Sequence, residues 1–319
     1  TLFRSKELSL FLGSGVSVPL GVPDWRTLLQ RVDPESEEAL EAKDLLDVAQ
    51  DIEGRIGRAE LEQRIVANVE VSGVAPTHML LAALFVQQNV TTNYDTAFDR
   101  ALDRTLGEGG YRVLTGQLAL QPQPWLLKYH GCITQPETII ITREDYNRLR
   151  NNLSALQSIV ESLMLTSHLM FVGFSMADAD FLYAAAKVNA VRALAENLDP
   201  SYVATVLALH PQAVMEHAGF NVVHMLEDPD QQSAARMLEI FLDQISWTVV
   251  KKGPASSSYL LDPNYQDLFA KDITTVKLRK RLHKLAISLE TGDSVCNARG
   301  WDQVAELLRR LGARGQEHT

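Results

Sequence analysis

The chain has 319 residues, of which 46% are hydrophobic, and its formal net charge is −10. This length and composition allow a large buried core in one big domain or two smaller ones. The charge is uneven, because residues 251–319 hold 12 Lys and Arg against 8 Asp and Glu, whereas residues 1–250 hold 18 against 32. The main body is therefore a poor candidate for non-specific nucleic-acid binding.

The sequence also disfavours membrane proteins and disulfide-rich or zinc-binding proteins. No apolar run approaches the roughly 18 residues of a membrane span, and charged residues occupy positions 4, 6 and 7, where a signal peptide would be apolar. Cys132 and Cys296 are far apart and neither belongs to a Cys-x-x-Cys pair. We therefore expect a reducing, cytoplasmic setting, no membrane contact and no metal.

Short apolar runs alternate with segments of helical spacing along the chain. The predicted strands are residues 8–12, 89–92, 125–129, 138–141, 169–174, 203–209 and 220–225. The predicted helices are residues 25–32, 37–56, 59–69, 77–87, 97–106, 143–165, 180–197, 213–218 and 231–244. This alternation predicts an α/β fold with a doubly wound, mostly parallel sheet.

Two regions depart from the alternation. Residues 33–73 carry a charged, amphipathic helical pattern, which predicts a helical insertion. The stretch KKGPASSS, from Lys251, has linker composition, and residues 276–289 beyond it alternate apolar and basic residues at helical spacing. We predict a domain over residues 1–250 and a linker with a C-terminal helical extension over 251–319. That extension either packs on the body or a partner, or offers a surface to an anionic ligand.

A glycine pair follows the first predicted strand in the stretch LSLFLGSGVSVPLGVPDW, residues 8–25. Glycines at such a position let a turn close tightly and approach a phosphate. The dinucleotide-binding fingerprint is incomplete, because Gly13 and Gly15 are followed by Gly21 and not by a glycine three residues on. Alone, the pair is compatible with a nucleotide site or with a tight strand-to-helix turn.

Polar residues follow three further predicted strands. They are Asn93 and Asp95 in VTTNYDTAFDRAL, His130 in LLKYHGCI, and Gly173 and Ser175 in LMFVGFSMADADF. Open α/β sheets bind ligands at the carboxyl ends of their strands. The four strand ends are therefore expected to converge on one crevice.

Together these segments resemble a sirtuin-type domain of the bacterial SIR2-like group. The resemblance rests on GSGVS at 13–17, GVPDWR at 21–26, TTNYD at 91–95, His130-Gly131 and VGFS at 172–175. It covers about residues 8–226 and implies a Rossmann-like fold whose ligand is NAD.

The resemblance also implies roles for individual residues. Gly13, Ser14, Gly15 and Ser17 would hold the pyrophosphate and the nearby ribose, and Pro23, Asp24, Trp25 and Arg26 would lie along the nicotinamide end. Asn93 would orient the ribose and the attacking water, Asp95 would recognise the carboxamide, and His130 would be the catalytic histidine. Gly173 and Ser175 would contact the adenosine side.

Some of these residues are also compatible with a purely structural role. Asn93 and Asp95 are also suited to cap the helix that is predicted from residue 97. His130 is also compatible with a hydrogen-bonded structural histidine. His78, in APTHML, is read as local structure at a helix start.

The departures from the family bear on the reaction. Protein-deacylating sirtuins carry a zinc module with two cysteine pairs, which two cysteines cannot supply. The resemblance therefore implies an NAD hydrolase that releases nicotinamide and ADP-ribose, in the manner of an antiphage defence effector controlled by homo-oligomerisation or by a regulatory protein partner. The alternatives are an NAD-dependent protein deacylase or ADP-ribosyltransferase, and a non-catalytic module that senses NAD or ADP-ribose.

Overall fold

The computed structural model describes residues 8–115, 123–152, 154–174, 179–192, 204–209, 221–225 and 231–252. The chain divides into two units, residues 1–246 and residues 247–319. Of the second unit, only residues 247–252 are among those described. The predicted linker and C-terminal extension therefore lie almost wholly outside the described residues, as do Ser175 and the predicted helix 213–218.

A seven-stranded sheet forms the centre of the first unit, and all its strand pairs are parallel. The strands are β1 (Leu8–Leu12), β2 (Gln88–Thr91), β3 (Arg112–Leu114), β4 (Trp125–Lys128), β5 (His168–Val172), β6 (Ala204–Ala208) and β7 (Asn221–His224). Their order is β3-β4-β2-β1-β5-β6-β7. The sheet thus extends from β1 in both directions, which confirms the prediction of a doubly wound, Rossmann-like fold.

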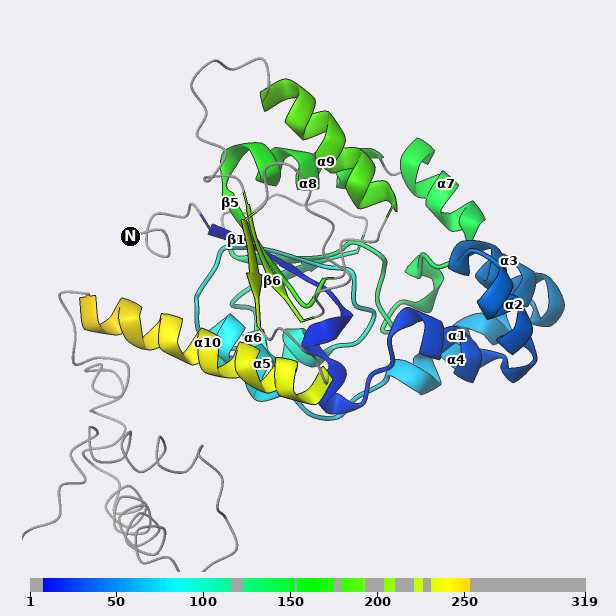
Figure 1. Ribbon diagram of the computed structural model, residues 1–319, viewed down its shortest axis with the longest axis horizontal. Coiled ribbons are helices and arrows are strands. Elements are labelled where there is room, and N and C mark those ends of the chain that lie inside the picture. The colour runs from blue at the N-terminus through cyan, green and yellow to red at the C-terminus, as the bar shows by residue number, and fades with distance from the viewer. Residues whose placement is uncertain are drawn as a thin grey trace, which may run out of the picture. The chain divides into compact units, whose positions relative to one another are not determined.

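Ten helices flank this sheet within the described residues. They are α1 (Trp25–Val32), α2 (Glu37–Ala42), α3 (Leu45–Ile56), α4 (Arg58–Val69), α5 (Pro76–Ala82), α6 (Ala97–Leu106), α7 (Arg143–Asn152), α8 (Ser154–Thr166), α9 (Ala179–Arg192) and α10 (Gln231–Lys252). In Figure 1, α8 and α9 lie above the sheet, α5, α6 and α10 lie below it, and α1 to α4 gather at its right-hand end.

Alternating side chains of the central strand β1 fill the cores on the two faces. Phe11 packs in one core with residues of α7, α8 and α9, including Phe181. Leu10 and Leu12 pack in the other with residues of α5, α6 and α10, including Leu238. Helices cover both faces of the sheet, so side chains on both sides of a strand are buried. This explains why the strands are continuous apolar runs in the sequence.

Helices α1 to α4 share a third core of their own. Leu29, Ile52 and Ile65 are completely buried in it. The charged pattern of residues 33–73 therefore belongs to the outer faces of helices that pack on one another.

The strand predicted at residues 138–141 was wrong. Thr138 is the last residue of a short 3₁₀ helix, Pro136–Thr138, and residues 139–141 after it pair with no strand of the sheet. Ile139 and Ile141 are buried in the core of helices α1 to α4, whereas Ile140 enters the core of α7 to α9. Burial on two sides gave this connecting segment the sequence pattern of a strand.

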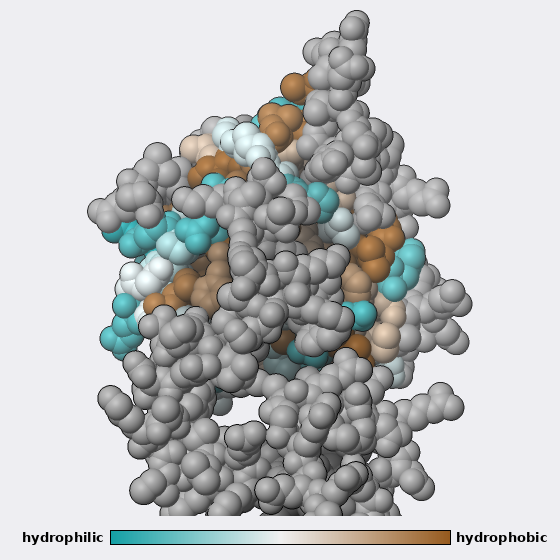
Figure 2. Space-filling view, turned by 90° about the vertical axis from the view of Figure 1, so that its left-hand side faces the viewer, coloured by the Kyte–Doolittle hydropathy of each residue, from teal (hydrophilic) through white to brown (hydrophobic). Residues whose placement is uncertain are grey.

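A helix that spans a membrane must be both long and apolar. Among the described residues, no helix combines the length and the apolar character needed to cross a bilayer. On the face shown in Figure 2, hydrophobic and hydrophilic residues alternate within the described part of the surface.

Candidate active site

Four strand ends lie side by side at one edge of the sheet. Leu12 of β1 pairs with Thr91 of β2 and with Val172 of β5, and Thr91 pairs with Lys128 of β4. A cavity of about 310 Å³ opens beside the residues that follow these strands. Because β1 is flanked by β2 and β5, this edge contains the topological switch point at which open α/β sheets bind ligands.

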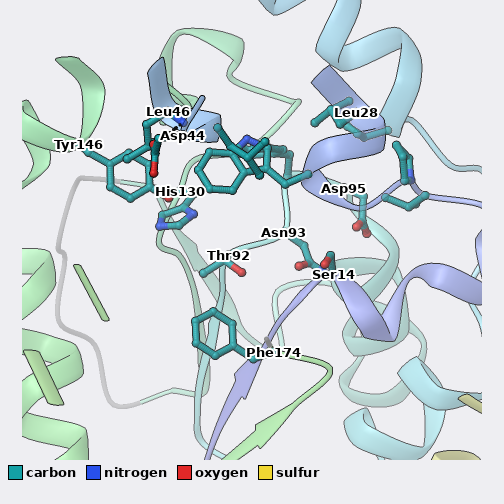
Figure 3. Close-up of a pocket in the computed structure, with 16 residues that line it drawn as sticks. Ser14, Leu28, Asp44, Leu46, Thr92, Asn93, Asp95, His130, Tyr146 and Phe174 are labelled. Atoms are coloured by element: carbon teal, nitrogen blue, oxygen red, sulfur yellow. Dashed lines mark hydrogen bonds between the residues drawn. The ribbon is translucent and has the colours of Figure 1, made fainter. Parts of the chain in front are cut away.

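The cavity draws its walls from the sheet edge and from the helices beside it. Its lining residues are Ser14, Val22, Pro23, Trp25, Leu28, Asp44, Leu45, Leu46, Val69, Thr92, Asn93, Tyr94, Asp95, His130, Tyr146 and Phe174. In the view of Figure 3, His130, Thr92 and Asn93 follow one another along one wall, with Tyr146 next to His130 and Ser14 next to Asn93. The structure thus brings the predicted Asn93 and His130 to the same cavity.

The glycines after β1 pack against the loop after β5. The Gly13 N–H donates to the carbonyl of Val172 at 3.0 Å, and the Gly15 N–H donates to the carbonyl of Gly173 at 2.9 Å. A Cβ atom on Gly15 would lie 2.7 Å from the Gly173 Cα. These N–H groups are engaged with protein carbonyls, and of the residues predicted to hold pyrophosphate, Ser14 lines the cavity.

Asn93 is held by its amide nitrogen and presents its amide oxygen. Its Nδ2 donates to the Gly13 carbonyl at 3.1 Å and to Ser17 Oγ at 3.3 Å. Its Oδ1 is buried and has no hydrogen-bond partner among the described residues. The indole N–H of Trp25, which also lines the cavity, is buried and likewise has no hydrogen-bond partner among the described residues. A buried donor or acceptor left unpaired is costly, so both atoms are suited to meet a ligand or water.

Asp95 and Ser17 form a buried pair behind Asn93. Ser17 Oγ donates to Asp95 Oδ2 at 2.9 Å, and the N–H of Ala97 donates to Asp95 Oδ1 at 2.9 Å. Asp95 therefore bonds the first turn of α6 as well as lining the cavity. Ser17, predicted to touch the ligand, is fully buried.

His130 follows β4 and is held in an aromatic row. Its ring centroid lies 5.2 Å from that of Tyr129 and 5.3 Å from that of Tyr146, which in turn stacks on Trp25 at 6.3 Å. The next residue, Gly131, has φ +88°, and a Cβ atom there would lie 2.2 Å from the Thr138 carbonyl oxygen. Only glycine fits this turn, which aims the histidine at the cavity.

Lys128 is buried beneath the site and carries a charge. Its ammonium lies 2.7 Å from the Asp99 carboxylate and donates to the main-chain carbonyl of Asp95. Burial by itself lowers the pKa of Lys128, but the attraction of Asp99 and other neighbours outweighs it and raises that pKa. The end of β4 is thus tied to the loop that carries Asn93 and Asp95.

Of the remaining residues that were predicted to contact NAD, some line the cavity and others make structural contacts. Pro23 and Trp25 line the cavity. Asp24 instead caps α1 by accepting from the Thr27 N–H at 2.7 Å, and Arg26 donates to the Leu40 carbonyl. Neither lines the cavity. Gly173 lies against the Gly15 loop, with its neighbour Phe174 on the cavity wall.

Helices α3 and α7 contribute residues to the cavity wall that the sequence analysis did not predict. Asp44 and Leu46, at the start of α3, and Tyr146 of α7 line the cavity. Arg143 joins the two helices through ion pairs to Asp44 at 2.8 Å and to Asp47. Nothing in the local sequence indicates that α3 folds over the strand ends, because a cap such as Asp44 shows only where a helix begins.

Asp145 fastens α7, and with it the Tyr146 wall, to α4. Its Oδ2 accepts from Arg58 at 2.7 Å and from the N–H groups of Ile141 and Thr142. Burial works to raise the pKa of this carboxyl, but the hydrogen bond from Arg58 and the N–H donors prevail and lower it from its usual 3.8. The folded state therefore favours the carboxylate.

We predict that Asp145→Asn lowers the free energy of unfolding at pH 7 by about 2–3 kcal/mol, since Arg58 loses its buried partner. Because the folded pKa is depressed, the contribution is complete above the unfolded pKa and is lost as pH falls through the folded pKa. Urea denaturation at pH 7 and near pH 3 should therefore show a smaller deficit in acid. An equal deficit at both pH values would contradict the assigned ion pair.

Among the described residues, no group of three or more His, Cys, Asp or Glu side chains is arranged to hold a metal ion. Residues 88–214 match a family model described as a SIR2-like domain. That segment contains Asn93, Asp95 and His130 and most of the strands around the cavity.

Curated relatives match over a longer stretch. A protein from Enterococcus faecium named "NAD(+) hydrolase ThsA" is 29% identical over 204 residues, which are 61% of this chain and 42% of that protein. One of the same name from Cytobacillus dafuensis is 23% identical over 186 residues, 57% of this chain and 38% of that protein. The matched segment thus spans about two fifths of the length of these relatives.

A solved structure titled "The Structural basis for Sirtuin Substrate affinity" covers 76% of this chain and 94% of its own, at 14% identity and a TM-score of 0.40.

Proposed function

We propose that this chain, which carries a SIR2-like domain, is an NAD hydrolase that cleaves the bond between nicotinamide and ribose. The observation that carries the proposal is the meeting of Asn93 and His130 at one cavity, where the Asn93 Oδ1 is buried without a partner among the described residues. The four relatives named NAD(+) hydrolase support the same reaction.

The proposed reaction needs little covalent chemistry from the protein. The bond between C1′ of the ribose and N1 of nicotinamide breaks, and its electron pair neutralises the cationic nicotinamide. A water oxygen then bonds to C1′ and releases one proton, which yields ADP-ribose. The developing positive charge on the sugar resembles that of glycoside hydrolysis.

Asn93 and His130 have separate tasks in this reaction. The Asn93 Oδ1 accepts a hydrogen bond from the attacking water or from a ribose hydroxyl and so orients it. The His130 ring, held between tyrosines, hydrogen-bonds a ribose hydroxyl. Positioning of this kind stabilises the transition state without a covalent intermediate on the protein.

The cavity suits the nicotinamide riboside end of NAD. Its volume of about 310 Å³ lies at the lower end of the roughly 300–1,000 Å³ range of ligand pockets. The row of Trp25, Tyr146 and His130 offers aromatic surface to a flat cationic ring. Ser175, which the resemblance assigns to the adenosine side, lies outside the described residues.

Incubation of the purified chain with NAD, with and without an acyl-lysine peptide, tests the reaction class. We expect the rate of nicotinamide release to be independent of the peptide, and ADP-ribose to be the second product. O-acyl-ADP-ribose or an ADP-ribosylated protein would point to a deacylase or transferase, and binding without turnover would point to a sensing module.

We further propose, from the resemblance to the SIR2-like group, an antiphage role restrained by homo-oligomerisation or by a partner protein. An enzyme that consumes its own cell's NAD requires such control. Light scattering and NAD turnover of the full chain and of a truncation after Lys252 test the part played by residues 253–319. Unchanged mass and activity would remove that segment from the proposal.

A further inference from the structure

The buried side chain of His78 lies behind the site and not on the cavity wall. It belongs to the first turn of α5 and has no exposed surface. Its Nδ1 accepts from the Ala75 N–H at 3.1 Å, and its Nε2 lies 3.2 Å from Ser17 Oγ. The sequence reading of local structure at a helix start accounts for the first contact but not for the second.

The contact with Ala75 fixes the tautomer of this histidine. A main-chain N–H can only donate, so His78 Nδ1 must be the unprotonated acceptor. Burial lowers the pKa of His78, against the opposing pull of Asp95, so the ring is neutral near pH 7. A neutral ring with a bare Nδ1 carries its proton on Nε2, which therefore donates to Ser17 Oγ.

The tautomer of His78 then determines the direction of the remaining hydrogen bonds. The Ser17 hydroxyl has one proton, which it donates in a hydrogen bond to the carboxylate of Asp95 at 2.9 Å. The Ser17 lone pairs accept from His78 Nε2 and from Asn93 Nδ2 at 3.3 Å. Since the amide nitrogen of Asn93 is directed to Ser17 and to the Gly13 carbonyl, its oxygen is left to face the cavity.

We propose that His78 is a positioning residue, which acts through Ser17 to hold the Asn93 amide with its oxygen toward the substrate. This inference rests on the proposed function of Asn93. His78 itself touches neither the cavity nor the reacting atoms, so its effect is expected on turnover more than on substrate binding.

Two conservative variants separate this role from simple helix capping. Asparagine places an amide atom near His78 Nδ1 and preserves the bond from Ala75, but it does not reach Ser17. Glutamine places an amide N–H near His78 Nε2 and preserves the donation to Ser17. We expect His78→Asn to lower kcat for NAD hydrolysis by about 10-fold or more, with KM within about 3-fold, and His78→Gln to recover most of that loss.

The double variant tests the route through Ser17. If His78 acts through that hydroxyl, Ser17→Ala combined with His78→Asn should be no slower than Ser17→Ala alone. Full activity of folded His78→Asn, or a His78→Gln variant no better than His78→Asn, would overturn the proposal. So would independent, additive losses in the double variant.

A spectroscopic measurement tests the hydrogen-bond direction on which the proposal depends, even if a variant fails to fold or the chain does not hydrolyse NAD. Long-range proton–nitrogen spectra of the wild-type chain with ¹⁵N-labelled histidine report the tautomer of each ring. We expect His78, assigned in the wild-type chain by correlating its ring with its own backbone, to be neutral with the proton on Nε2 at pH 7. A proton on Nδ1, or a charged ring, would overturn the proposal independently of any activity.

Discussion

Replacement of Asn93 by alanine is expected to lower kcat for NAD hydrolysis by at least about 100-fold, the scale of losing a group that orients the reacting atoms. The variant removes the buried Oδ1 that faces the cavity, together with two hydrogen bonds to Gly13 and Ser17. Steady-state kinetics on protein with wild-type circular dichroism measures the effect. Asn68→Ala, on α4 and away from the residues that line the cavity, with its Nδ2 donating to the Arg64 carbonyl of the preceding turn, is the matched control.

His130→Ala should cause a loss of similar size, because we propose that the His130 ring hydrogen-bonds a ribose hydroxyl of the substrate. His168 is a suitable control, since it lies at the amino end of β5 and bonds Thr205 at 3.0 Å. His168→Ala should leave turnover within about 3-fold of wild type. If folded Asn93→Ala or His130→Ala turned over NAD at a rate near wild type, the proposed roles would have to be abandoned.

The second large effect is expected at Gly15. A Cβ atom there would lie 2.5 Å from Leu209 Cδ1 and 2.7 Å from the Gly173 Cα. The leucine side chain can move, but the Gly173 backbone, which is bonded to the Gly15 N–H in the loop after β5, cannot move without losing that hydrogen bond. We therefore expect Gly15→Ala to destabilise the protein by about 3 kcal/mol, at the upper end of the usual cost of overpacking. For a domain of this size, that corresponds to a fall of about 6–12 °C in Tm.

Gly73→Ala provides the matched control for Gly15→Ala. The nearest atom to a Cβ on Gly73 is Leu20 Cδ2 at 4.0 Å, so this variant should keep the wild-type Tm within about 2 °C. A Gly15→Ala protein of unchanged Tm but weakened NAD affinity would instead favour the sequence interpretation, in which Gly15 makes room for the ligand.

The sequence predicted the sheet well because buried parallel strands leave a clear signal. The run at Leu8–Leu12 and the one at His168–Val172 are mostly apolar, are buried on both faces, and are each followed by a glycine. The edge strand Arg112–Leu114 was missed, since it has three residues and only one of them is buried. The helix predicted over residues 37–56 divides at Lys43, where Asp44 caps a new helix.

Site residues close to a strand end were easier to place than those that arrive through packing. Asn93 and His130 follow β2 and β4 directly, so the parallel register is enough to bring them together. Asp44 and Tyr146 reach the cavity because α3 and α7 dock beside it, and His78 reaches Ser17 across 61 residues of chain. Such contacts depend on tertiary packing, which no local motif encodes.

The measurement that tests the central claim most directly is a chromatographic time course of NAD, nicotinamide and ADP-ribose. It uses the purified wild-type chain and Asn93→Ala side by side, at several protein concentrations and without any acceptor other than water. We expect the wild-type chain to release nicotinamide and ADP-ribose in equal amounts, and Asn93→Ala to release at least about 100-fold less. Undiminished NAD at every wild-type concentration, or equal turnover by the two proteins, would contradict the account.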